Sequence, residues 1–153
     1  MSQDFYLGNP NLKKVGTEIQ FTKEQIQEYL RCKEDPVYFA MNYIKIISLD
    51  EGIVPFKMWD FQQELIESFH ENRFNIAKLP RQTGKSTTCV SYLLHYILFN
   101  DNVNVGILAN KLSTARDLLG RLQLAYEQLP LWIQQGIVVY NKGSMELENG
   151  SKI

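Results

Sequence analysis

The spacing of apolar residues in the first third of the chain predicts a polar arm followed by helices. Residues 1–21 hold a turn cluster and two lysines but no apolar period, so we expect an arm or linker there. The capping pattern Thr22-Lys23-Glu24-Gln25 then precedes Ile26, and a helix is expected to begin at this point. Asp35-Pro36 starts a second helix, with apolar positions on one face from Val37 to Ile47.

The segment Ile46–Glu51 combines an apolar run with Asp50-Glu51, as does the strand on which many nucleotidases hold Mg²⁺. We reject that interpretation because the segment continues a helical period and precedes, rather than follows, the phosphate-binding motif described below. The expected structure is a helix end and an exposed acidic turn at Gly52. A further helix is expected between Pro55 and Phe69.

The middle of the chain alternates strand and helix patterns. The apolar run Phe74–Leu79 predicts a strand, and Ser86–Phe99 predicts a helix that is apolar on nearly all sides and therefore buried. His95 in that helix is expected to be a hydrogen-bonded core or interface residue. Val103–Ala109 has the nearly continuous apolar character of a strand covered on both faces. An amphipathic helix follows, with apolar positions from Ala115 to Leu129.

The last seventeen or so residues predict an antiparallel meander. Turns at 141–143 and 149–150 separate the apolar segments 137–140, 145–147 and 152–153. The third of these segments is only two residues long. We therefore expect the sequence to be a fragment that stops in the middle of a sheet.

Composition narrows the class of protein. The chain has 153 residues, of which 44% are hydrophobic and 22% charged, and a net charge of −1. These values are typical of one globular domain and give no overall basic surplus, although a local basic channel stays open as an alternative. No apolar run approaches the ~20 residues of a membrane helix, and the first twenty residues lack the apolar core of a signal peptide. Cys32 and Cys89 are expected to be reduced, packed thiols.

A phosphate-binding motif lies between the predicted strand and the buried helix, at Leu79-Pro80-Arg81-Gln82-Thr83-Gly84-Lys85-Ser86. In such a loop, backbone N–H groups and a helix start surround the phosphates, Gly84 allows close approach, Lys85 supplies charge and the Ser86 hydroxyl holds Mg²⁺. Leu79 stands where the usual pattern has a first glycine. The plainer alternative is a turn with a basic surface, because chance Gly-Lys-Ser triplets are common.

Three more residues complete the predicted site. Arg81 lies inside the loop and is placed to stabilise transition-state charge in cis, and Thr87 can cap the helix or assist. Gln62 lies upstream beside Trp59 and Phe61, and a carboxamide can donate to and accept from an adenine edge at once. An isolated glutamine is more often a helix-surface amide. The full set of expected ATP-contacting residues is Gln62, Arg81, Gln82, Thr83, Gly84, Lys85, Ser86 and Thr87, with Arg81 and Lys85 catalytic.

These residues resemble the large terminase subunit of contractile-tailed bacteriophages, the ATPase that packages DNA. The loop at 79–86 resembles that family's Arg-Gln-x-Gly-Lys-Ser/Thr form, and Asp60-Phe61-Gln62 resembles its adenine-recognition glutamine. Residues 105–111 and 140–151 are similar to its next strand and hairpin. The resemblance runs from about Tyr6 to the end.

The resemblance implies an α/β chain with the three-layer P-loop NTPase fold of the RecA/ASCE type, incomplete, with an N-terminal helical region and a C-terminal antiparallel hairpin. The expected divisions are an arm at 1–21, a helical subregion with the adenine-reading segment at 22–71, and an ATPase core at 72–153. The acidic strand, coupling motif and nuclease domain of the family have no counterpart in this sequence. The fragment alone is therefore expected to bind ATP poorly or moderately and to hydrolyse hardly any.

The resemblance also implies partners and a place of action. These are double-stranded DNA, the portal protein, the small terminase subunit and further copies in a homo-oligomeric ring, in the host cytoplasm on the procapsid portal, without secretion or a membrane. Two other functions stay open. One is a fragment of a helicase-like DNA translocase, and the other is a non-catalytic nucleotide-binding module.

Overall fold

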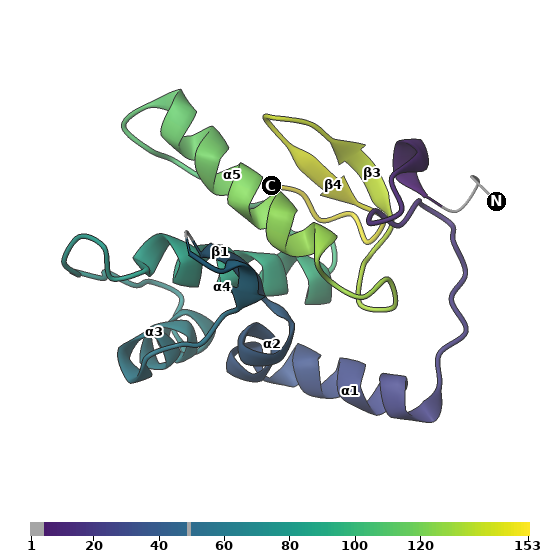
Figure 1. Cartoon of the computed structure of the whole chain (residues 1–153), viewed down its shortest axis with the longest axis horizontal. Coiled ribbons are helices and arrows are strands. Elements are labelled where there is room, and N and C mark those ends of the chain that lie inside the picture. The colour runs from purple at the N-terminus through teal and green to yellow at the C-terminus, as the bar shows by residue number, and fades with distance from the viewer. Residues whose placement is uncertain (1–4, 49) are drawn as a thin grey trace.

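Helices are the main regular elements of the computed structural model, which describes residues 5–48 and 50–153. The described residues form a mixed α/β structure with five α-helices and two antiparallel strand pairs (Figure 1). In chain order the elements are a 3-10 turn at Tyr6–Gly8, α1 (Lys23–Glu34), α2 (Pro36–Tyr43), β1 (Lys45–Ser48), β2 (Gly52–Pro55), α3 (Asp60–Glu71), α4 (Lys85–Phe99), α5 (Leu112–Glu127), β3 (Ile137–Tyr140) and β4 (Met145–Leu147).

The first two helices begin at the predicted caps. The Thr22 hydroxyl accepts a hydrogen bond from the Gln25 N–H at 3.2 Å, and the Gln25 side chain accepts one from the Thr22 N–H at 3.0 Å. The Asp35 carboxylate accepts from the Tyr38 N–H at 2.8 Å, and Pro36 occupies the first turn. Each bond satisfies an N–H that the start of a helix leaves open. Both predicted helix starts are confirmed.

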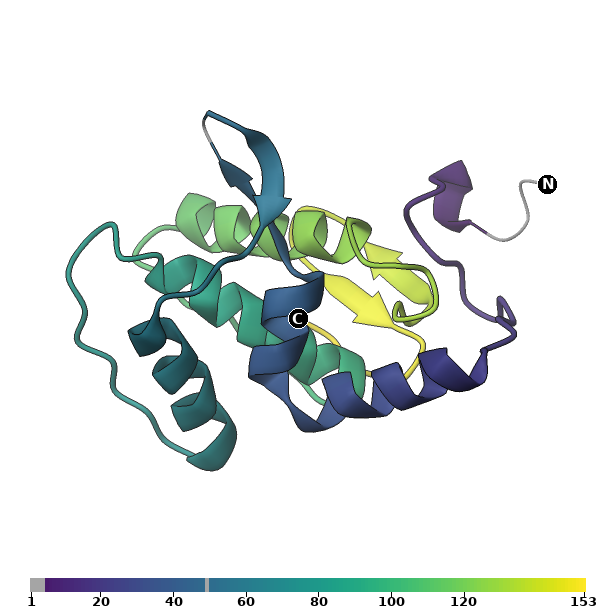
Figure 2. The same cartoon turned by 60° about the horizontal axis from the view of Figure 1, so that its bottom comes forward.

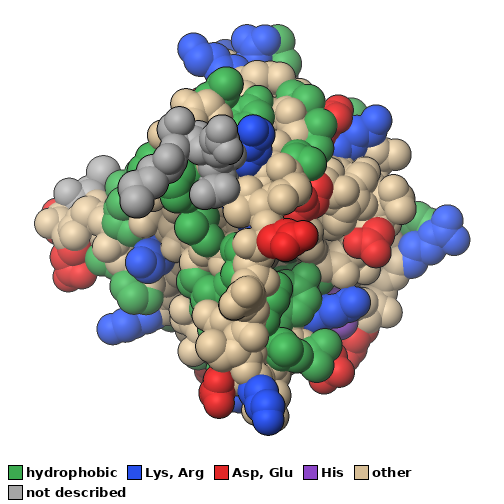
Figure 3. Space-filling view, turned by 90° about the vertical axis from the view of Figure 1, so that its right-hand side faces the viewer, with side chains coloured by type: hydrophobic (Ala, Val, Ile, Leu, Met, Phe, Trp, Pro, Cys, Tyr) green, Lys and Arg blue, Asp and Glu red, His purple; other side chains and the backbone are tan. Residues whose placement is uncertain are grey.

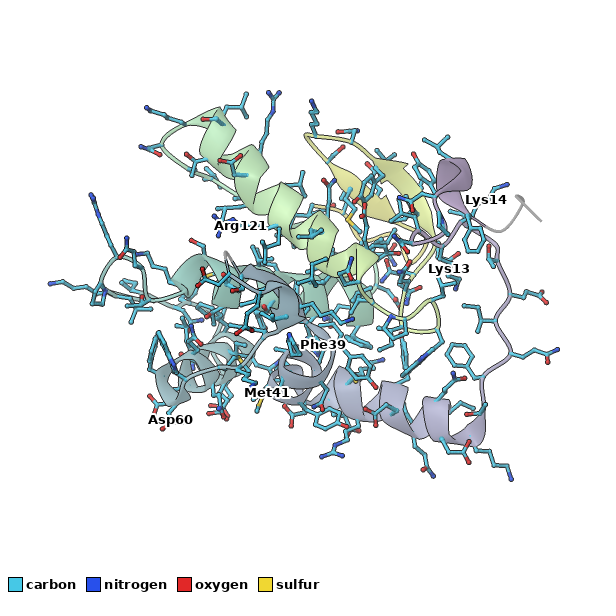
Figure 4. All side chains as sticks on the ribbon, viewed as in Figure 1. Lys13, Lys14, Phe39, Met41, Asp60 and Arg121 are labelled. Carbon is cyan, nitrogen blue, oxygen red and sulfur yellow. The ribbon has the colours of Figure 1, made fainter. Side chains whose placement is uncertain are left out.

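The buried helix α4 is the centre of the core, as predicted from its apolar composition. It packs against α2, α3 and α5, and Val90, Leu94, Ile97 and Leu98 are buried along it. Phe39 on α2, labelled in Figure 4, brings its ring to 5.5 Å from the Phe99 ring. Burying such a side chain contributes about 1.5–3 kcal/mol. The core therefore holds the start of α4, and with it the candidate loop, in a fixed place.

One predicted helix is shorter than expected. The helix from Pro36 ends at Tyr43 instead of continuing to Ile47, and Lys45–Ser48 and Gly52–Pro55 form the hairpin β1–β2 with Ile47 opposite Ile53. Helical and strand periods both fit this apolar run, and the turn at Gly52, with φ of 74°, decides for the hairpin. Asp50 and Glu51 are exposed in the turn as predicted.

The predicted hairpin β3–β4 is confirmed, and two other segments extend it. After the turn at 149–150, Lys152 forms an antiparallel bridge with Glu146 and a parallel bridge with Asn104. Lys14 bridges Ile137 of β3 on the other side. The arm is thus docked on the hairpin through its residues 5–16, and Leu12 is buried there, although the sequence predicted no packing for it.

Two predicted strands are absent from the structure. Residues 74–79 form no strand and run through a loop that stands away from the helices in Figures 1 and 2. Of 103–109, only Asn104 is bridged, while Val105 and Lys152 share a hydrogen bond of 2.8 Å. A strand forms only when another strand satisfies its N–H and C=O groups, and none of the described residues pairs with 74–79. Parallel pairing is limited to the two single bridges in the part of the chain described.

No helix in residues 5–48 or 50–153 is long and apolar enough to cross a membrane. Cys32 and Cys89 are both free thiols, as predicted, and burial raises the pKa of Cys32 to about 12.

Candidate functional site

The candidate loop, residues 79–86, turns sharply where α4 begins. Gln82 has φ of 63° and Gly84, the N-cap of α4, has φ of 71°. Glycine adopts this left-handed conformation freely, whereas in other residues it costs about 1–2 kcal/mol. A left-handed residue followed by a helical one, as Gly84 is followed by Lys85, is a backbone conformation in which successive N–H groups can form a concavity for an anion.

A row of backbone N–H groups is left open by this turn. None of the N–H groups of residues 82–87 donates to an acceptor among the residues that the structure describes, whereas the N–H of Thr88 donates to the Gly84 carbonyl at 3.0 Å. Every helix leaves its first few N–H groups open, and the N–H groups of Gln82 and Thr83 extend the row backwards. Together with the helix dipole they form a site suited to an anion.

The ammonium group of Lys85 is folded back onto the loop. It donates to the Pro80 carbonyl oxygen at 3.1 Å, and the Thr83 hydroxyl donates to the same oxygen at 3.0 Å. The only ion pair among the described residues is Lys13–Glu148, so Lys85 meets no carboxylate there. A phosphate oxygen would be a stronger acceptor for this ammonium than a neutral carbonyl.

The Gln62 side chain is hydrogen-bonded to the candidate loop. Its side-chain oxygen accepts from the Trp59 N–H and its side-chain nitrogen donates to the Thr83 carbonyl, both at 3.0 Å, and it is 4% exposed. A Cβ added to Gly84 would lie 2.5 Å from that nitrogen. The carboxamide therefore links the start of α3 to the loop, a role that the sequence did not reveal. Its predicted contact with adenine remains a prediction.

Aromatic side chains lie at the same end of α3. Trp59, which precedes Asp60 (labelled in Figure 4), is exposed, and its ring centroid is 5.6 Å from that of Phe61. An exposed indole beside the loop support is a surface on which a planar base can stack.

The remaining predicted residues lie on different sides of α4. Lys85 and Ser86 line a cavity of about 360 Å³ that residues 106–108 also line. Thr87 lines another cavity, of about 320 Å³, together with Arg121 of α5, which is labelled in Figure 4. The structure thus brings Lys85 and Ser86 together and directs Thr87 elsewhere. Arg81 is exposed and makes no ion pair with any described residue.

His95 is a core residue, as predicted. Its Nε2 lies 2.8 Å from the Cys32 carbonyl oxygen and therefore carries the proton that it donates, while Nδ1 is buried without a partner. Burial lowers the pKa of His95 from 6.5 to about 4. The imidazole is therefore neutral at neutral pH and packs against both Phe39 and Phe99.

No protein-family model matches this sequence. Among the described residues, no three or more His, Cys, Asp or Glu side chains gather where they could hold a metal ion.

Proposed function

We propose that this chain is the ATP-binding part of a phage large terminase subunit, an ATPase that couples hydrolysis to movement of double-stranded DNA into a procapsid. The proposal includes a fold, the three-layer P-loop NTPase fold of the RecA/ASCE type, of which this chain is an incomplete part. The portal protein, the small subunit and a ring of copies are further partners within it. This part rests on the ordered resemblance of the motifs at 60–62, 79–86 and 105–111.

One observation supports nucleotide binding above the others: the open N–H row of residues 82–87 next to the Lys85 ammonium. A triphosphate would accept from this row and draw Lys85 from the Pro80 carbonyl. A single carboxylate has only two oxygens to accept from these N–H groups, whereas a triphosphate has many more. The arrangement favours a polyphosphate over a single carboxylate.

The roles of the neighbouring residues follow from their positions. Ser86, beside Lys85 in the same cavity, would hold Mg²⁺, and the ion would neutralise phosphate charge. Arg81 is exposed in the loop, and in this proposal its guanidinium pairs with the outer phosphate. Trp59 offers its ring to the base, next to the Gln62 link that fixes the loop.

A P-loop NTPase fold requires strands beside the loop. Ala77 and residues 106–108 line the same cavity as Lys85 and Ser86, and they have no strand partners among the described residues. Phe74, Ile76 and Leu108 are highly exposed nearby. Within this proposal, residues 74–79 and 103–109 are paired as strands in the working ATPase, and this pairing covers the exposed side chains.

Titration with a fluorescent ATP analogue tests nucleotide binding. We expect Lys85→Ala to lower affinity at least about tenfold, because a charge-assisted hydrogen bond contributes about 1.5–3 kcal/mol. Lys57→Ala removes an exposed lysine outside the loop and serves as the control. Equal affinity in the Lys85 and Lys57 variants would reject the nucleotide site.

The same titration examines Gln62. We expect Gln62→Ala to weaken ATP more than GTP, because in this proposal the carboxamide leaves Trp59 and Thr83 to donate to and accept from the adenine edge. An equal loss for both nucleotides would restrict Gln62 to its structural link with Thr83.

A further inference from the structure

A cavity of about 320 Å³ lies between β1, α4 and α5, and none of residues 79–86 lines it. Figures 1 and 2 both show β1 close to these two helices. The apolar lining is entirely aliphatic and consists of Ile44, Ile46, Ile47, Val90, Leu124 and Ala125. Ile44, Val90 and Ala125 are 2%, 5% and 3% exposed, whereas Ile47 is 63% exposed. The cavity is therefore bounded by buried side chains on one side and open to water on the other.

Both charged side chains that line this cavity are cations. Lys45 of β1 and Arg121 of α5, labelled in Figure 4, are exposed, so their charges lie on the open side. Neither forms an ion pair with any described residue. The other polar lining residues are Thr87 and Ser91, and the Ser91 hydroxyl donates to the Thr87 carbonyl at 2.8 Å. The ammonium and the guanidinium are thus the strongest donors available to a ligand.

Acidic side chains of the neighbouring segments lie outside the cavity lining. Asp117 is one turn before Arg121 on α5, and Asp50 and Glu51 are in the turn of the hairpin. None of the three lines the cavity. The face shown in Figure 3 differs, because acidic and basic side chains are interspersed there among hydrophobic ones. An anion that enters the cavity therefore meets two cations and no carboxylate in its lining.

The aliphatic lining and the two cations together define a ligand class. The volume is at the lower end of the roughly 300–1,000 Å³ of small-molecule sites, which is too small for a helix or strand of another protein. No aromatic side chain lines the cavity, so a planar body has no ring on which to stack. A guanidinium can bind both oxygens of a carboxylate at once. We propose that this cavity binds a small aliphatic carboxylate, with an unbranched chain of about six to ten carbon atoms.

The expected affinity follows from the buried chain. Octanoate, with ten non-hydrogen atoms, is expected to bind with a dissociation constant of about 0.1–1 mM. Each further CH₂ from hexanoate to decanoate should strengthen binding about fourfold, because each transfers apolar surface from water to the aliphatic lining. This inference goes beyond the proposed function and does not depend on nucleotide binding.

Methyl NMR during titration with sodium octanoate tests the location. The methyl signals of Ile44, Ile46 and Leu124 should shift and saturate together. Two comparison sites serve as controls. Ile26 and Ile133 line a hollow of about 370 Å³ beside α1, and Ile107 and Ile153 line a cavity of about 220 Å³ that Arg116 and Lys142 also line. Equal or larger shifts at either comparison site, or shifts without saturation, would overturn the proposal.

Charge removal tests the carboxylate. Lys45→Gln and Arg121→Gln should each weaken octanoate about three- to fivefold, the effect of a partly exposed ion pair. Neither should change the affinity for 1-octanol, which has the same chain without the charge. Lys57→Gln and Arg116→Gln are matched controls, because both side chains are exposed and line no part of this cavity. Equal loss for octanoate and 1-octanol, or equal loss in the controls, would reject anion recognition.

Filling the cavity provides a further measurement. Leu124→Trp places an indole among the lining residues and should abolish octanoate binding, while circular dichroism reports whether the helices remain. Undiminished affinity in this variant would contradict binding in the cavity. If Leu124→Trp does not fold, the exposed Lys45 and Arg121 variants still decide the matter. Lys85→Ala should leave octanoate affinity unchanged, so failure here is distinct from failure of the nucleotide site.

Discussion

Gly84→Ala is the most direct perturbation of the candidate loop. The residue has φ of +71°, and an added Cβ would lie 2.5 Å from the side-chain nitrogen of Gln62. The left-handed conformation costs alanine about 1–2 kcal/mol. Moving the amide breaks its bond to the Thr83 carbonyl, which costs about 1 kcal/mol more.

Alanine also reduces the freedom of the unfolded chain, which offsets about 0.5 kcal/mol of that loss. We therefore expect Gly84→Ala to lower the free energy of unfolding by about 2 kcal/mol, measured by urea unfolding followed by circular dichroism. Gly120→Ala is the matched control. Gly120 lies in α5 with open space around its Cβ position, so the same change should stabilise the protein by up to about 1 kcal/mol.

A double-mutant cycle isolates the contact. In a Gln62→Ala background no amide meets the new methyl group, so Gly84→Ala should cost about 1 kcal/mol less than in the original chain. Additive effects of the two substitutions would refute the proposed contact between Gln62 and the loop. A neutral Gly84→Ala in the original chain would refute the left-handed turn as well.

Two more predictions concern buried polar groups outside the loop. His95 stays neutral in the folded chain to about pH 4 but takes up a proton near pH 6.5 when unfolded, so stability should fall by about 2 kcal/mol from pH ~7.5 to ~5. Urea unfolding at both pH values should show that His95→Leu removes most of this slope, and an unchanged slope would contradict the assignment. Burial alone would raise the pKa of Glu148, but the net effect is a lowered pKa. The lowering comes from hydrogen bonds donated by the N–H groups of Gly136 and Gly16, at 2.7 and 3.1 Å, and from the positive charge of Lys13. Glu148→Gln should speed amide exchange at Gly16 but not in α4, and equal protection would mean that the arm is held by other contacts.

Local sequence was sufficient for the starts of α1 and α2, for the buried helix α4 and for one hairpin. Thr22 and Asp35 form the predicted caps, because each bond reaches only three residues along the chain. The buried helix α4 and the hairpin β3–β4 follow from apolar runs and turn residues close together in sequence. The hairpin β1–β2 was missed because its isoleucines fit a helical period equally well.

The sequence by itself also determined the chemistry available at residues 79–86, namely a lysine, a serine and a glycine at the start of a buried helix. Only the tertiary structure decided how these groups are held. Gln62 reaches Thr83 across twenty-one positions of the chain, and no periodicity records such a contact. Strand formation at 74–79 likewise depends on a partner strand, because the backbone of an isolated strand has no acceptor or donor of its own to satisfy it.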